Sequence, residues 1–112
     1  MQIHLSPRHL RLTAAIHTHC ASKIEHLEQL AGEIVAAHVV LIYDEVAKPK
    51  DRYSVKVHLA VPGPDIHAEE SAQELYAALD LVVDKLARQL RKRKTKLKDK
   101  PRAKAQAVAR RR

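Results

Sequence analysis

Basic side chains recur at helical spacing in the segment "DKLARQLRKRKTKLKDK", residues 84–100. At 100° per residue, positions three and four residues apart fall on one side of a helix, here beside an apolar stripe of leucines and valines. Basic side chains in such a row bind phosphate groups through charge-assisted hydrogen bonds. The spacing therefore predicts a helix with one face for packing and one flank for binding a polyanion. The flank consists of Lys85, Arg88, Lys92 and Lys96.

The positive charge of the 112-residue chain is concentrated in its last quarter. Residues 85–112 hold 14 of the 21 Lys and Arg residues but only one of the 13 acidic residues, Asp99, so residues 1–84 are weakly acidic. A solvated helix face usually carries acidic partners four residues away, and they are scarce here. Nucleic acid is favoured over an anionic membrane because no bulky aromatic or leucine-rich face accompanies the charge.

Eight histidines raise the possibility of a metal site. His17 and His19 would point to different faces of a helix, and no H-E-x-x-H motif is present. His58 and His67 could be neighbours on adjacent strands, but two ligands do not close a site. We therefore predict no metal and no cofactor, and the histidines allow a modest gain in RNA affinity below about pH 6.5.

The sequence also offers little for catalysis. Its two glycines, Gly32 and Gly63, cannot form a glycine-rich phosphate loop, and no nucleophile, base and orienting group stand out together. The single cysteine, Cys20, lies on the apolar face of an expected helix, which is typical of a core thiol. We expect a protein that is not an enzyme and has no small-molecule substrate.

The N-terminal sequence has no long apolar run typical of a signal peptide, and the longest apolar stretch, residues 34–43, is half the length that spans a membrane. One cysteine excludes an intramolecular disulfide framework. These features predict a soluble, cytoplasmic protein with no membrane partner.

Periodicity along the chain predicts six elements. Thr13 is a plausible N-cap for the first helix, and Ser71-Ala-Gln-Glu74 fits a capping box at the start of the last helix. Residues 101–112 begin with Pro101 and have no apolar period, so we expect a mobile basic tail there. The expected elements are strand 2–6, helix 14–32, strands 36–46, 52–61 and 66–70, and a helix from 71 to about 97.

This β-α-β-β-β-α order favours an α+β two-layer sandwich, in the α/β class, with a four-stranded sheet and both helices on one face. The first strand should pair parallel to the second through a right-handed crossover, and the other pairs should be antiparallel. We expect one domain, residues 1–100, followed by the basic tail, residues 101–112.

The segment "AEESAQELYAALDLVVDKLARQLRKRKTKLKDK", residues 68–100, closely resembles the C-terminal half of the hibernation-promoting factor domain, found in the ribosome-associated inhibitor (protein Y) family. That family has an acidic-Met-Tyr-x-Ala-Ile-Asp segment leading into Asp-Lys-Leu-x-Arg-Gln, and Leu75 replaces its usual Met here. "LRLTAAIHTHCASKIEHLEQL", residues 10–30, resembles the family's strand-to-helix entry and first helix, although its "KIEHLEQ" is less basic.

The resemblance implies a βαβββα domain, similar to double-stranded-RNA-binding domains, that binds 16S rRNA of the small ribosomal subunit. Occupancy of the mRNA and tRNA channel near the decoding centre would then block translation in slow growth or stationary phase. Family members contact rRNA phosphates through the last helix, with some contacts from the first. Carried over by position, the RNA-binding residues are Lys23, Lys85, Arg88, Arg91, Lys92, Lys94 and Lys96.

The chain resembles a short form of the family, because residues 101–112 are too few to form the dimerising domain that long forms append. The resemblance implies that pairing of ribosomes would need a helper such as ribosome modulation factor, and that the protein is a monomer off the ribosome. Two alternatives remain open: a general double-stranded-RNA or tRNA-binding module without ribosome specificity, and an interaction protein whose basic tail docks an acidic partner.

Overall fold

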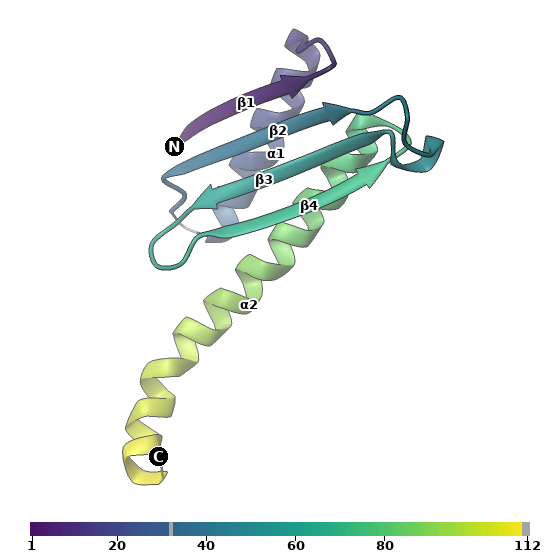
Figure 1. The fold of residues 1–112 in the computed structure, drawn as a ribbon. Coiled ribbons are helices and arrows are strands. Elements are labelled where there is room, and N and C mark those ends of the chain that lie inside the picture. The colour runs from purple at the N-terminus through teal and green to yellow at the C-terminus, as the bar shows by residue number, and fades with distance from the viewer. Residues whose placement is uncertain (32, 111–112) are drawn as a thin grey trace.

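The computed structural model describes the backbone of residues 1–31 and 33–110, and the side chains of residues 1–30 and 33–93. Three strands follow the first helix before the chain enters a long second helix, so the element order is the predicted one (Figure 1). A short 3₁₀ helix, η1, lies between the second and third strands. The elements are β1 (Gln2–Arg8), α1 (Ala14–Ala31), β2 (Ala36–Tyr43), η1 (Pro49–Asp51), β3 (Tyr53–Ala60), β4 (Ile66–Ala72) and α2 (Leu75–Arg110).

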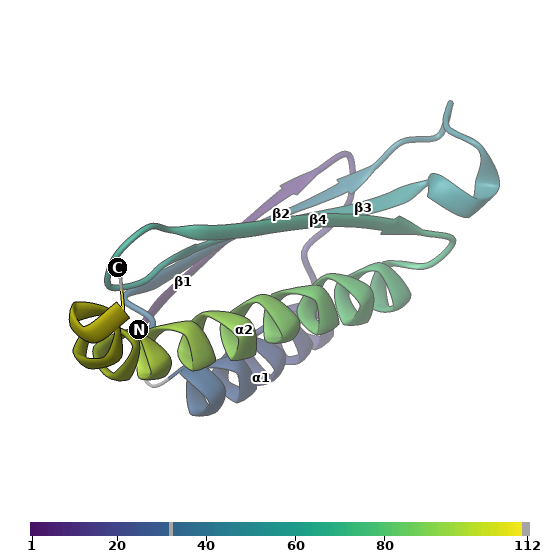
Figure 2. The same cartoon turned by 90° about the horizontal axis from the view of Figure 1, so that it is seen from below.

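The four strands form one sheet in the order β1-β2-β3-β4. β1 pairs parallel to β2, while β2–β3 and β3–β4 are antiparallel, as predicted. Both helices lie against the same face of the sheet, which leaves the other face open (Figure 2). The predicted α+β two-layer sandwich is therefore confirmed.

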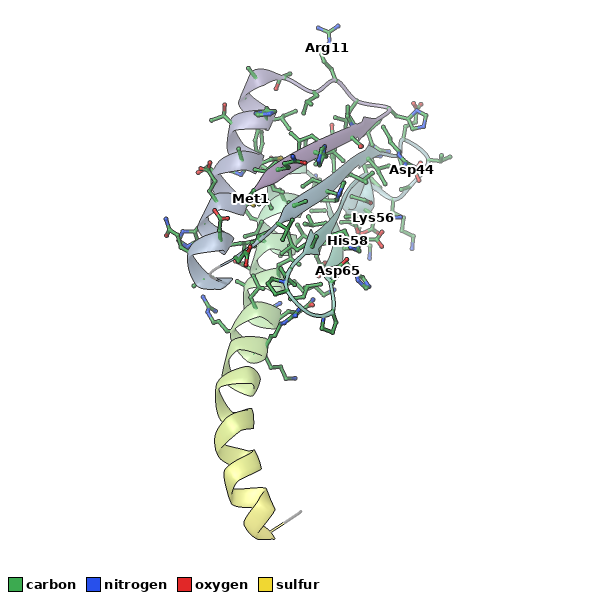
Figure 3. The ribbon with its side chains drawn as sticks, turned by 90° about the vertical axis from the view of Figure 1, so that its left-hand side faces the viewer. Met1, Arg11, Asp44, Lys56, His58 and Asp65 are labelled. Atoms are coloured by element: carbon green, nitrogen blue, oxygen red, sulfur yellow. The ribbon has the colours of Figure 1, made fainter. Side chains whose placement is uncertain are left out.

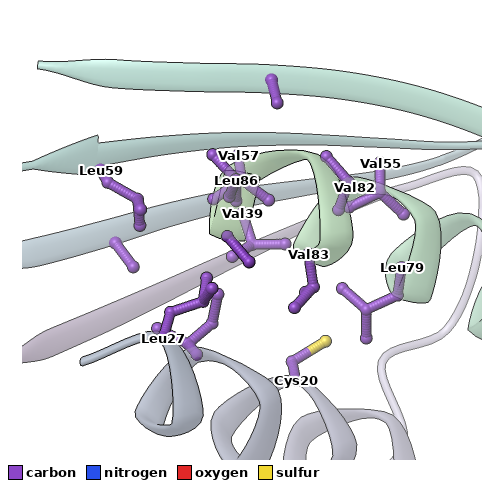
Figure 4. Packing of buried hydrophobic residues seen from close by; sticks show 14 of the residues in the cluster. Cys20, Leu27, Val39, Val55, Val57, Leu59, Leu79, Val82, Val83 and Leu86 are labelled. Carbon is purple, nitrogen blue, oxygen red and sulfur yellow. The ribbon is translucent and has the colours of Figure 1, made fainter. Parts of the chain in front are cut away.

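The core between helices and sheet is aliphatic. Alternate residues of each central strand point toward the helices, and no polar or charged residue is buried in the part of the chain with described side chains. Burial of these apolar side chains supplies most of the driving force that holds the two layers together. Figure 4 shows the packing of Cys20, Leu27, Val39, Val55, Val57, Leu59, Leu79, Val82, Val83 and Leu86.

The predicted N-cap of α1 is confirmed, but the predicted start of α2 is wrong. The Ile16 N–H donates to Thr13 Oγ1 at 3.2 Å, which satisfies one free donor of the first turn. Ser71, by contrast, lies in β4, which continues to Ala72, and its hydroxyl donates to Asp51 Oδ1 at 3.2 Å. The helix begins at Leu75 because strand pairing and this hydrogen bond already engage the residues of the expected capping box.

Three further boundaries differ from the predictions. β2 ends at Tyr43 rather than at the predicted Val46, because the chain turns there and the Val46 N–H donates to Asp44 Oδ1 at 3.0 Å. β1 continues through Pro7 to Arg8. An edge strand allows a proline because its missing N–H would have pointed away from the sheet. α2 continues past Leu97 and Pro101 to Arg110, so its predicted end was too early. The division between a domain, residues 1–100, and a mobile tail, residues 101–112, stays a prediction.

Candidate nucleic-acid interface

α2 provides the predicted two faces over the section that packs on the sheet. Between Leu75 and Leu90, apolar residues at intervals of three and four are buried, and this stripe fixes how the helix is rotated on the sheet. Figure 1 shows that the helix then extends beyond the sheet. A 36-residue helix is about 54 Å long, more than these short strands cover.

Arg88, Arg91 and Lys92 lie on the exposed side of α2. At 100° per residue, Arg91 and Lys92 lie on either side of Arg88, within an arc of about 100°. The three basic groups therefore face solvent together, opposite the buried stripe. We call Arg88, Arg91 and Lys92 the α2 basic face.

Lys85 and Lys23 are less available than the sequence indicated. Lys85 Nζ lies 3.3 Å from Glu70 Oε2 and donates to the Glu69 carbonyl at 3.4 Å, so it points toward β4. Lys23 Nζ, on α1, lies 3.5 Å from Asp80 Oδ1. Exposed pairs of this kind are weak, so each lysine can still exchange its carboxylate for a phosphate at a small cost. Among side chains 1–30 and 33–93, no carboxylate makes such a pair with the α2 basic face.

The side chains of Lys94 and Lys96 lie outside the described residues. The α2 backbone is helical at both positions, as predicted. Their contribution to RNA binding stays a prediction.

Arg93 has a structural role that the sequence analysis missed. It lies five helical turns after Leu75, so it continues the buried stripe just where the sheet ends. Its guanidinium donates to the carbonyls of Pro62 and Pro64 in the β3–β4 turn. Gly63 between them has φ of 85°, a conformation that favours glycine, and a Cβ there would collide with the guanidinium.

The described residues show no candidate for the chemistry of a catalytic centre or closed metal site. Burial raises the pKa of the Cys20 thiol to about 11, which disfavours the thiolate that a nucleophile needs. Within residues 1–30 and 33–93, no group of three His, Cys, Asp or Glu side chains is arranged to hold a metal ion. Nor does any helix in the described ranges combine the length and apolarity of a membrane span.

Relatives whose names state a function match nearly the whole chain. Ribosome hibernation promoting factor from Escherichia coli strain K12 is 38% identical over 98 residues, which cover 88% of this chain and 98% of that protein. The Klebsiella oxytoca protein of the same name is 37% identical over 98 residues, which again cover 88% of this chain and 98% of that protein. Ribosome hibernation promotion factor from Deinococcus radiodurans is 39% identical over 97 residues, covering 86% of this chain but 51% of that longer protein.

Solved structures share the fold. The N-terminal domain of Thermus thermophilus Protein Y superposes with a TM-score of 0.68 and 28% identity, covering 82% of this chain and 98% of that one. A ribosomal subunit interface protein from Coxiella burnetii superposes with a TM-score of 0.73 and 22% identity, covering 85% of this chain and 99% of that one. This likeness supports the fold alone. The family described as Sigma 54 modulation protein / S30EA ribosomal protein matches residues 3–98. As the resemblance of the last helix predicted, the chain belongs to this Sigma 54 modulation protein / S30EA ribosomal protein family.

Proposed function

We propose that this protein is a ribosome hibernation factor that binds 16S rRNA of the small ribosomal subunit. The observation that carries the proposal is the α2 basic face, which a rigid two-layer sandwich presents to solvent on the side opposite its own packing stripe. The names of the relatives that match nearly the whole chain support the same activity. Because phosphate contacts carry no base code, recognition depends on RNA shape and backbone.

The protein acts by occupancy and performs no reaction. Seated in the mRNA and tRNA channel near the decoding centre, it excludes both ligands and keeps ribosomes idle in slow growth or stationary phase. Its place is the cytoplasm, where ribosomes are, and it reaches them as a monomer. If it promotes pairing of ribosomes, it needs a helper such as ribosome modulation factor.

The α2 basic face is tested by co-sedimentation with separated small and large ribosomal subunits, with bulk tRNA as competitor. We expect stoichiometric binding to the small subunit that tRNA does not displace. Arg88→Glu with Lys92→Glu should abolish it, because two phosphate contacts become repulsions, while folding is intact since both side chains are exposed.

A matched control reverses the same number of charges elsewhere. Arg11→Glu with Lys50→Glu changes two exposed basic residues in the loop before α1 and in η1, and should leave binding almost unchanged. Tight binding by a folded Arg88→Glu, Lys92→Glu protein would refute the proposed site. Equal, tRNA-sensitive binding to both subunits would instead favour a general RNA-binding module.

A further inference from the structure

Four histidines form a row across the open face of the sheet, one from each strand. In the strand registers His4 is opposite His38, His38 is opposite His58, and His58 is opposite His67. All four are exposed, on the side of the sheet that the helices do not cover. Since neighbouring strands lie about 4.8 Å apart, the row extends over roughly 14 Å. We call these four residues the histidine row.

The rings in the row contact one another in sequence. His4 and His38 stack with centroids 4.8 Å apart and planes 12° apart. His58 and His67 stack at 6.1 Å and 10°, and His38 meets His58 edge-on at 6.5 Å. Within residues 1–30 and 33–93 no group of three His, Cys, Asp or Glu side chains is arranged to hold a metal ion, so we do not interpret the row as a metal site.

Histidine is the side chain that ordinarily changes charge between pH 5 and 8. Imidazolium rings at these separations repel one another, and an anion bound beside them offsets that repulsion. An anion with several charges in a line fits this need better than a single ion, because it can offset more than one ring at once. An RNA backbone supplies such a line of phosphates.

The other charged groups on this face leave the row short of internal counterions. Asp65, in the β3–β4 turn, is the acid in contact with it: its Oδ2 lies 2.8 Å from His58 Nε2. That hydrogen bond lowers the pKa of Asp65, with Arg93 contributing through its charge. By strand alternation, Glu69 and Lys56 face each other in the next row and Arg8 lies one row further. Figure 3 shows Lys56, His58 and Asp65 on the side of the sheet away from α1.

We propose that the histidine row is a second, proton-dependent contact surface for RNA phosphates, on the face of the sheet opposite α1 and α2. Among the described side chains one carboxylate, that of Asp65, contacts the row, and it reaches His58 alone, so lowering the pH converts this face from nearly neutral to positive. By linkage, bound RNA in turn raises the proton affinity of the row. The inference rests on the proposed function in one respect only, namely that the ligand is RNA.

The test measures binding of a 16-base-pair RNA duplex, labelled with a pH-insensitive cyanine dye, by fluorescence anisotropy at pH 5.5, 6.5 and 7.5 and fixed ionic strength. We expect affinity to rise on the order of tenfold from pH 7.5 to 5.5 as two or more rings gain charge. His38→Gln with His58→Gln should remove most of that rise.

The matched control is His17→Gln with His26→Gln, two exposed histidines of α1, and it should keep the whole pH-dependent rise. Loss of the rise in both double variants, or in neither, would overturn the proposal. Thermal unfolding at each pH checks that the variants are folded.

The measurement is repeated in the Arg88→Glu, Lys92→Glu background. There, weak binding that still strengthens at low pH would support the histidine row even if the α2 basic face failed its own test. A background protein whose RNA binding no longer depends on pH would count against a separate surface on the sheet.

Discussion

Asp80 determines how much of the Lys23 charge is available to a ligand. Its carboxylate lies 3.5 Å from Lys23 Nζ and 3.4 Å from His19 Nε2, so it draws both α1 groups toward α2. Lys85 has the same relation to Glu70 on β4. Among the described side chains no carboxylate pairs with the α2 basic face, so we expect Arg88, Arg91 and Lys92 to be the stronger RNA contacts.

Asp80→Asn should therefore raise the affinity for the small ribosomal subunit by about two- to fivefold at low salt, the range expected for release of an exposed ion pair. Sedimentation binding curves at one ionic strength measure the change. In a Lys23→Ala background the same substitution should have a smaller effect, because no lysine is left to release. Equal effects in both backgrounds would show that Lys23 does not contact RNA and that Asp80 acts by repulsion alone.

At the scale of elements, α2 combines a packing role with the proposed binding role, and Arg93 marks the point where the packing ends. Beyond Leu90 the sheet no longer covers the helix. There the Arg93 guanidinium holds α2 by donating hydrogen bonds to the turn carbonyls of Pro62 and Pro64. This interaction joins the exit of the helix to the turn between β3 and β4.

Arg93→Ala should lower the free energy of unfolding by about 1–2 kcal/mol, because two carbonyl acceptors lose a charged donor in a partly exposed site. Urea denaturation followed by circular dichroism measures the decrease. Arg91→Ala, an exposed arginine two residues earlier, is the control and should change the free energy by less than about 0.5 kcal/mol. An equal effect of the two substitutions would mean that the turn does not depend on Arg93.

The sequence was sufficient for those elements whose burial follows a simple period. Alternation predicted β3 within one residue at each end, and spacing of three and four predicted the buried stripe of α2. The capping-box prediction failed because Ser71 pairs within β4 and its hydroxyl donates to Asp51, which is twenty residues away in sequence. The pairing of Lys23 with Asp80 was not predictable for the same reason, since only the folded chain brings α1 and α2 together.

At the scale of the whole molecule, acidic and basic residues are separated along the chain, and this separation orients the protein before it touches a polyanion. Residues 1–84 carry most of the acidic groups, while residues 85–112 carry most of the basic ones. A chain with this separation of charge approaches a polyanion with α2 first.

The affinity for the small subunit should accordingly fall steeply with salt, with a slope in log–log form that counts the phosphates neutralised. Lys92→Gln should reduce the magnitude of that slope by about 0.7–0.9, the value expected when one fewer phosphate is neutralised. Arg11→Gln, outside the proposed interface, should leave the slope unchanged. Binding measured between about 50 and 300 mM KCl distinguishes the two, and a shared change would indicate bulk charge rather than defined phosphate contacts.

Pro7 has a consequence for how copies of this chain behave toward one another. It lies in β1 at one edge of the sheet, where a proline leaves no backbone donor for an incoming strand. The other edge, β4, carries the charged pair Glu69 and Glu70, which a matching strand would have to bury or repel. Both edges of the sheet thus resist pairing with a strand of a second molecule. This protects the protein against edge-to-edge aggregation when it is concentrated.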